Sequence, residues 1–290
     1  MNHNLRLIVR GAYDLQKIRI QMGNRIVGNL KVKLGQAPGQ PEEEMDAAGK
    51  DLLRTLRADY KKITDGVAGG GIPSPRRFKA LGVISTYTEL CLISQYLDIE
   101  QSEDQHFRRL GNILKEYPVY TEFLEGVRGV GPAMAGVILS EIDISKARHP
   151  SSLWKYAGLD CAADGKGRSR KAQHLEVVTY VNKDGEEAQR NGITFNPWLK
   201  TKLVGVLGSS FVKAGGPYRE IYDGCKHRLE NHAVYATVSK GHRHNMAVRY
   251  MVKMFLVDLY TVWRELEGLP VSLPYQEAKL GYRHGVGFAA

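Results

Sequence analysis

The side chains best suited to chemistry lie in a basic loop, DGKGRSRKAQ, at residues 164–173. Cations spaced by Gly and Ser in this way are typical of a mobile segment that contacts phosphates. The predicted phosphate contacts of the loop are Lys166, Arg168, Arg170 and Lys171. Ser169 lies among them, and a neighbouring base or cationic clamp such as His174 could activate its hydroxyl as a nucleophile. The competing interpretation is a solvated charge run.

The leading candidate for phosphate contact, ahead of the basic loop, is the segment 123–143, FLEGVRGVGPAMAGVILSEID, whose apolar spacing predicts a helix-hairpin-helix. Glycines permit a tight turn and leave the first N–H groups of the following helix open to an anion. Pro132 suits the first turn of that helix. The predicted backbone contacts to phosphate are Gly129, Val130, Gly131 and Ala133. The alternative is a turn that only separates two helices.

Composition favours an anionic partner. The 290 residues contain 41 Lys and Arg against 31 Asp and Glu, a formal net charge of +10. DNA is the leading partner and structured RNA the second. No apolar run is long enough to span a bilayer and the N-terminus lacks a signal-peptide pattern, so we expect a cytoplasmic protein without a membrane partner. Three widely spaced cysteines predict reduced thiols.

The elements that must position these residues are mostly helical. Residues 1–118 predict a helical arm, coiled-coil-like, with a Gly/Pro-rich hinge near 66–75. An apolar stripe from Leu15 to Leu30 in this arm predicts self-association into a homo-oligomer. Residues 119–282 predict a second helical domain, followed by a flexible tail at 283–290.

The second domain contains the one strong strand signal, a β-hairpin turning at Asp184-Gly185. The fold class is therefore mainly α, with a helical arm, a helix-hairpin-helix and one β-hairpin. Helices predicted from residues 197 and 241 carry further cations that extend the basic surface, and these are Lys200, Lys202, Arg243, Arg249 and Lys253.

Other constellations predict less. Cys225, His227, His242 and His244 match no standard zinc spacing, so no metal is expected, and no cofactor motif is present. Cys161 is a second nucleophile candidate, although a buried thiol is the commoner role. Glu141 ends a predicted helix and is expected to be a cap or a solvated group.

Several segments in order resemble the C-terminal Tnp domain of Piv-type (DEDD) insertion-sequence transposases, including those guided by a bridge RNA. The segments are VRGVGPAMAGVILSEI, SSLWKYAGL, the basic loop, NGITFNPWLKTKLVGVL and HRHNMAVRYMVKMFLVDLY, within residues 80–282. The resemblance implies DNA binding in transposition or recombination, with the arm standing for the family's coiled coil.

Two departures qualify the implied activity. The family places a RuvC-like nuclease domain with acidic metal ligands before its coiled coil, whereas Asp14 is the only acidic residue here before Glu42. The family's catalytic serine, in a Ser-Gly pair, is replaced by Ala163 or Asp164, so Ser169 could act only from a shifted loop. Whether the chain is an enzyme therefore stays open.

The leading interpretation is a nucleic-acid-binding protein of transposase or recombinase descent without its own nuclease domain, recruiting any nuclease in trans. The alternatives are an active serine recombinase with a relocated nucleophile and a structural helical assembly protein of a mobile element.

Overall fold

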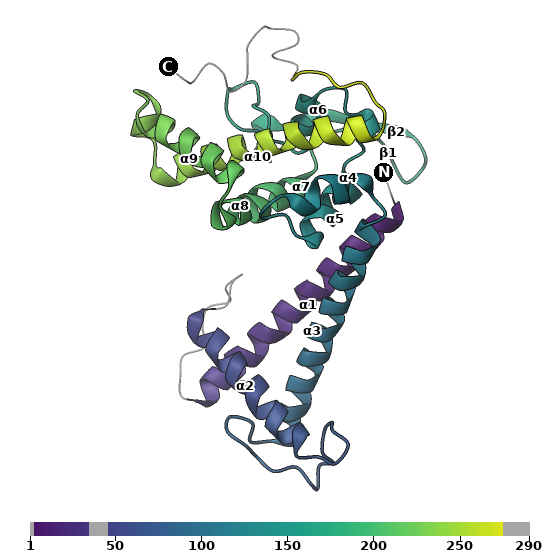
Figure 1. The fold of residues 1–290 in the computed structure, drawn as a ribbon, viewed down its shortest axis with the longest axis vertical. Helices are drawn as coiled ribbons and strands as arrows, with labels where there is room; N and C mark the ends of the chain where they lie inside the picture. Colours follow the sequence, from purple (N-terminus) through teal and green to yellow (C-terminus); the bar gives the residue numbers. More distant parts are fainter. Residues whose placement is uncertain (1–2, 35–45, 275–290) are drawn as a thin grey trace. The chain divides into compact units, whose positions relative to one another are not determined.

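The computed structural model describes residues 3–34 and 46–274. The chain is mainly helical with one antiparallel β-hairpin, which confirms the predicted fold class. It divides into two compact units (Figure 1). The N-terminal unit comprises Leu7–Arg109, and the C-terminal unit comprises the residues before it together with those from Leu110 onward.

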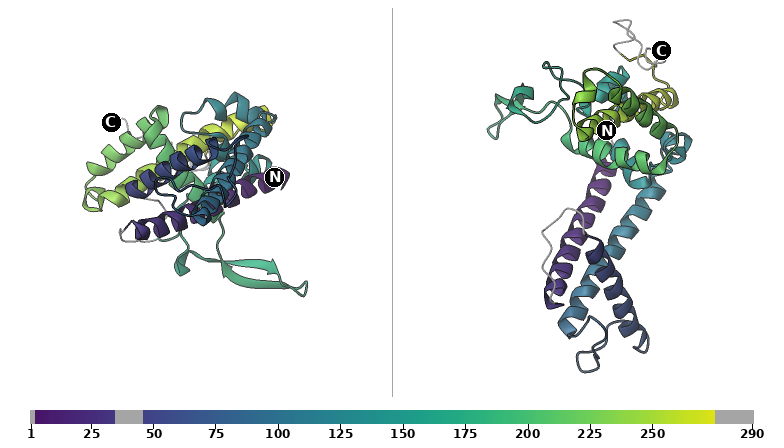
Figure 2. Two further views of the ribbon diagram at one scale, coloured as in Figure 1. Left: turned by 90° about the horizontal axis from the view of Figure 1, so that it is seen from below. Right: turned by 90° about the vertical axis from the view of Figure 1, so that its left-hand side faces the viewer.

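Three helices build the N-terminal unit: α1 (His3–Lys33), α2 (Ala47–Asp65) and α3 (Tyr87–Leu114), of which α1 and α3 continue into the other unit. α1 and α3 lie side by side in both ribbon views, and α2 packs against them (Figures 1 and 2). Their shared core includes Ile26, Leu30, Leu56, Leu90 and Tyr96. The stripe predicted for self-association is therefore used in part by the chain itself, because Ile26 and Leu30 are buried in its own core.

Polar contacts fix the ends of these helices. Asp46 caps α2 by accepting from the Gly49 N–H at 2.7 Å, and it also accepts from Lys31 Nζ at 2.7 Å. The Gly/Pro-rich segment 66–75 connects α2 to α3 within this unit. The chain after this segment is held to α2, because the Val83 N–H donates to the buried carboxylate of Asp59 at 3.0 Å.

The C-terminal unit is a set of short helices around one long helix. Its elements are α4 (Pro118–Glu122), η1 (Leu124–Gly126), α5 (Pro132–Glu141), η2 (Ile144–Lys146), α6 (Pro150–Tyr156), η3 (Ala172–His174), β1 (Glu176–Val181), β2 (Glu187–Gly192), α7 (Pro197–Thr201), η4 (Lys202–Leu207), α8 (Gly208–Ala214), α9 (Pro217–Glu230), η5 (Tyr235–Thr237) and α10 (Lys240–Leu266).

α10 organises this unit, and α4, α6, α8 and α9 contact it. Phe255 of α10 is fully buried against Phe211 of α8 and Tyr218 of α9, with ring centroids 5.3 and 5.5 Å away. Such aromatic packing contributes more than area burial alone. In the described ranges, no helix carries an apolar segment long enough to cross a bilayer.

The β-hairpin has the predicted turn, with Gly185 at φ 83°. β1 and β2 pair from Glu176 opposite Gly192 to Val181 opposite Glu187. Val177 and Val181 are exposed, so the hairpin buries little of its own apolar surface. It leaves the helical body of this unit as a separate arm (Figure 2).

Gly158 turns the chain from the end of α6 into the basic loop. Its φ is 64°, and a Cβ at this position would lie 2.5 Å from Cδ2 of Phe195. The adjacent Asn196 N–H donates to the Tyr156 carbonyl oxygen at 2.8 Å, which holds the two segments together. The position therefore excludes a side chain by both backbone conformation and contact.

We expect Gly158→Ala to lower the free energy of unfolding by about 3 kcal/mol, from left-handed backbone strain and overpacking against Phe195. Gly268→Ala is the matched control, since Gly268 follows α10 with φ 65° and no atom lies within 4 Å of the added Cβ. The Leu269 N–H there donates to the Arg264 carbonyl oxygen at 2.8 Å, as the Leu159 N–H does to Trp154 at 2.7 Å. The control substitution should cost about 1 kcal/mol. Equal losses in urea denaturation of the two variants would contradict the role assigned to Phe195.

Candidate nucleic-acid interface

The basic loop has defined backbone hydrogen bonds. Cys161 and Gly167 form an antiparallel bridge, and the Ala162 N–H donates to the Lys166 carbonyl oxygen at 2.8 Å. The Arg168 N–H donates to the Asp160 carbonyl oxygen at 3.1 Å. These bonds make the first half of the loop a narrow turn that begins directly after Gly158.

The prediction that Arg168 contacts phosphate directly is wrong, because its guanidinium is not exposed to solvent. The side chain is buried, with Nε donating to Asp160 Oδ2 at 2.8 Å and Nη1 to Glu176 Oε1 at 2.6 Å. The two carboxylates raise the pKa of Arg168 above its ordinary value. Arg168 therefore ties the loop to the start of β1, and any binding role is indirect.

Lys200 of α7 and Arg249 of α10 converge on this turn. Lys200 Nζ donates to the carbonyl oxygen of Arg168 and lies 4.7 Å from the centre of the Phe195 ring. Arg249 Nη2 donates to the carbonyl oxygens of Gly158 and Asp160 at 3.3 and 3.2 Å. Cations from two helices thus meet on one loop.

The convergence has an electrostatic cost. Burial and then repulsion by Arg249 lower the pKa of Lys200 to about 8, with Asp160 opposing the shift. Arg168 and Arg170 repel the ammonium as well. Burial also lowers the pKa of Arg249. A bound anion would relieve this repulsion, which is the property expected of a phosphate-binding surface.

Lys253 borders the same cluster from the next turn of α10. Its ammonium lies 5.1 Å from the centre of the Trp154 ring, and burial lowers its pKa, with Arg249 adding repulsion. A cation held against an aromatic face is stabilised by the ring quadrupole. Lys253 therefore adds positive charge to the predicted basic surface, although its side chain is largely buried.

The other predicted cations divide into two groups. Lys166, Arg170 and Lys171 are exposed on the loop, as a phosphate-contacting role requires. Arg243 instead donates Nη1 to the carbonyl oxygens of η5, including Ala236 at 2.8 Å, and so supports that turn. Lys202 Nζ lies 5.8 Å from the centre of the Trp198 ring.

The predicted helix-hairpin-helix is confirmed in its turn and in its second helix, α5. In place of a continuous first helix, the short α4 and η1 lie directly before the Gly-Val-Gly turn. The Val130 N–H is occupied, donating to the Val127 carbonyl oxygen at 3.0 Å, and Gly129 is covered by Phe211 and Ser210. In the described part of the chain, no side chain caps α5. Gly131 and Ala133 therefore remain as candidate backbone contacts, and Val130 does not.

Ser169 is part of a hydrogen-bonded chain with His174 and Asp164. Ser169 Oγ lies 2.8 Å from His174 Nδ1, and His174 Nε2 lies 3.2 Å from Asp164 Oδ2. The Ser169 N–H also donates to Nδ1 at 3.0 Å, so Nδ1 is the unprotonated nitrogen and Nε2 carries the hydrogen. The imidazole is buried, while Asp164 is partly exposed. The order of groups is that of a nucleophile, a base and an orienting carboxylate.

Two further expectations are corrected. Glu141 is fully buried instead of solvated, accepting from Asn196 Nδ2 at 2.6 Å and pairing with Arg6 Nε at 3.0 Å. Cys161 is exposed instead of buried. In the described ranges, the zinc candidates form no metal-binding group, and His244 Nδ1 lies 2.7 Å from the Tyr222 hydroxyl.

The sequence missed the acidic residues that position the site. Asp160 and Glu176 each lie eight residues from Arg168, a separation with no periodic signature, because it depends on how the loop folds back. From the sequence alone, Asp164 only occupies the position of the family's serine. Its spacing to His174 across a glycine-containing turn offered the only signal that they would meet.

Comparisons with protein-family models, with curated protein sequences and with solved structures find no match to this chain.

We expect Lys200 to titrate near pH 8 in the folded protein. Arg249→Gln should raise the pKa towards the ordinary lysine value, because it removes the nearby positive charge. Folding lowers the pKa of Lys200, so between about pH 8 and pH 10.5 the unfolded chain binds more protons than the folded chain. The contribution of Lys200 to the free energy of unfolding therefore rises with pH across this range. NMR of the lysine side-chain carbons measures the titration.

The control for this titration is Arg190→Gln, in the β-hairpin, where the guanidinium lies over Tyr180. It should leave the Lys200 midpoint unchanged. A midpoint that moves equally in both variants would show that net charge, not contact with Arg249, sets the pKa.

Proposed function

We propose that the C-terminal unit binds nucleic acid through the phosphate backbone, as a protein of transposase or recombinase type. The observation that supports this is the convergence of Lys200, Arg249 and the basic loop on one turn, with a lowered pKa at Lys200. DNA is the proposed partner and structured RNA the alternative substrate. The resemblance to Piv-type transposases adds transposition or recombination as the process.

The cluster suits backbone recognition better than base reading. Its covered cations are fixed by carbonyl oxygens and aromatic rings, whereas the exposed Lys166, Arg170 and Lys171 are placed to contact phosphates. Phosphate contacts position a protein on nucleic acid without specifying sequence. We also propose that a partner supplies the nuclease carboxylates in trans. The protein would self-associate and would be located in the cytoplasm.

We expect replacement of Lys166, Arg170 and Lys171 by Met to weaken binding to duplex DNA about tenfold and to reduce its salt dependence, because fewer counterions are released. Fluorescence anisotropy from low to moderate salt measures both, with structured RNA titrated in parallel. The control replaces Lys61, Lys62 and Lys79, exposed cations of the N-terminal unit, by Met. Wild-type affinity that ignores salt, or equal losses in the two variants, would overturn the proposal.

A second candidate function is supported by the Ser169–His174–Asp164 chain. Ser169 Oγ would attack a backbone phosphorus, passing its proton to His174 Nδ1 while the P–O bond to the leaving strand breaks. Asp164 would stabilise the imidazolium that forms, through Nε2. This is the relocated-nucleophile alternative, and it yields a strand joined to Ser169.

We expect Ser169→Ala to abolish a covalent protein–DNA adduct on denaturing gels while leaving binding within about twofold, because the hydroxyl adds no charge. Ser209→Ala is the control, since Ser209 is exposed on α8 and donates to the Gly205 carbonyl oxygen. No adduct in the wild type would reject the nucleophile and leave the binding proposal intact.

A further inference from the structure

A second cationic site lies in the N-terminal unit, apart from the residues proposed to bind nucleic acid. A cavity of about 360 Å³ opens between α1, α2 and α3. Among the described residues, its lining includes four cations and no acidic side chain. The polar lining residues are Arg19, Asn24, Lys50, Arg54, Arg57 and Tyr96. A volume in this range fits a small molecule, since ligand cavities begin at about 300 Å³.

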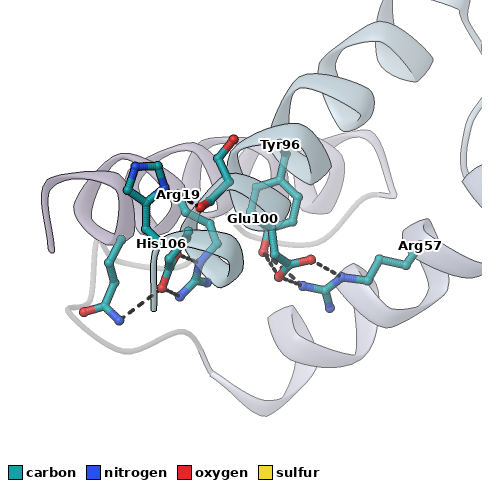
Figure 3. A network of polar contacts seen from close by, with 8 residues as sticks. Arg19, Arg57, Tyr96, Glu100 and His106 are labelled. Atoms are coloured by element: carbon teal, nitrogen blue, oxygen red, sulfur yellow. Dashed lines mark hydrogen bonds and ion pairs between the residues drawn. The ribbon is translucent and has the colours of Figure 1, made fainter. Parts of the chain in front are cut away.

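Two of the cations, Arg57 and Arg19, are held in place by carboxylates of α3. Arg57 donates Nε and Nη2 to the two oxygens of Glu100 at 3.2 and 2.5 Å, and Nη2 also to the Tyr96 hydroxyl at 3.1 Å. Arg19 donates Nε and Nη2 to Glu103, the second at 3.3 Å. Figure 3 shows Arg19, Arg57, Glu100 and Tyr96 in this network.

This arrangement orients the guanidiniums. Each carboxylate takes the Nε and Nη2 edge of its arginine, which directs the Nη1 side away from that carboxylate. Glu100 and Glu103 do not line the cavity, although Arg19 and Arg57 do. Arginines fixed in this way lose less side-chain entropy when they bind an oxyanion.

Lys50 and Arg54 complete the lining from one face of α2. Both are exposed, and Arg54 Nη1 pairs with Asp51, one turn earlier at 3.2 Å, in a contact where both side chains face solvent. Solvated pairs of this kind contribute little and yield readily to a ligand. The apolar side chains of the lining are Ile20 and Leu53.

We propose that this cavity binds a phosphate monoester, with Arg19 and Arg57 as the fixed donors and Lys50 and Arg54 as the adaptable ones. A phosphate monoester is close to a dianion at neutral pH and accepts several charge-assisted hydrogen bonds at once. Its source is either a free nucleotide or the 5′-phosphate of a nucleic-acid strand, which share this chemistry. Ile20 and Leu53 would contact the carbon skeleton next to the phosphate.

Calorimetric titration of the full chain with adenosine monophosphate tests the proposal. We expect saturable binding that Lys50→Met with Arg54→Met weakens about tenfold, because two charge-assisted contacts are lost. Lys61→Met with Lys62→Met is the matched control, with the same charge change on the same helix outside the cavity. It should change affinity by less than about twofold.

A second arm identifies the source of the phosphate. If a 5′-phosphorylated oligonucleotide binds more tightly than its 5′-hydroxyl form, and the difference needs Lys50 and Arg54, the cavity takes a strand end. If only the free nucleotide shows this dependence, the ligand is a small molecule. Binding of unphosphorylated adenosine with equal affinity, equal losses in both double variants, or no binding in any arm would overturn the proposal. None of these outcomes bears on the loop cluster around Lys200.

Discussion

The guanidinium of Arg168, held between Asp160 and Glu176, is the interaction on which the candidate interface depends. Taking a charged group out of water is costly, and both carboxylates are needed to offset that cost. Once Arg168 is fixed, its carbonyl oxygen accepts from Lys200, and the following residue, Ser169, lies against His174. One buried cation therefore sets the positions of both the cationic cluster and the serine chain.

The two units use arginine–carboxylate pairs for different ends. In the C-terminal unit the carboxylates bury Arg168 and shape a loop, while its neighbour Arg170 is exposed to solvent. In the N-terminal unit the pairs hold Arg19 and Arg57 while those side chains line a cavity. Arg168 thus makes one bond to each of two carboxylates, whereas Arg19 and Arg57 each make two bonds to a single carboxylate.

Much of the fold was predictable because its signals are local. Local patterns predicted a helical arm in the region of α1, α2 and α3 and a helix at α10, and the Asp-Gly turn located the β-hairpin. The basic character of the loop was also local and visible. The burial of Arg168 and Glu141 was not, because charged residues are expected in solvent. The partners of Arg168 are brought to it by the folding of the loop, and those of Glu141 come from distant segments.

The turn before α5 shows that backbone contacts are also only partly predictable from the sequence. Glycine spacing predicted a tight turn, and Gly129 has the positive φ that this requires. The loss of the Val130 amide to Val127 and the cover of Phe211 over Gly129 follow from packing that no local pattern encodes.

By itself, the sequence determined the helical class, the position of the β-hairpin, the excess of positive charge and the loop that concentrates it, since these follow from composition and near-neighbour periodicity. Only the tertiary structure decided which cations are covered, that Lys200 and Arg249 meet on one turn, and that His174 joins Ser169 to Asp164. The physical reason is that desolvation and charge pairing depend on separations in space, which chain folding sets and sequence spacing does not.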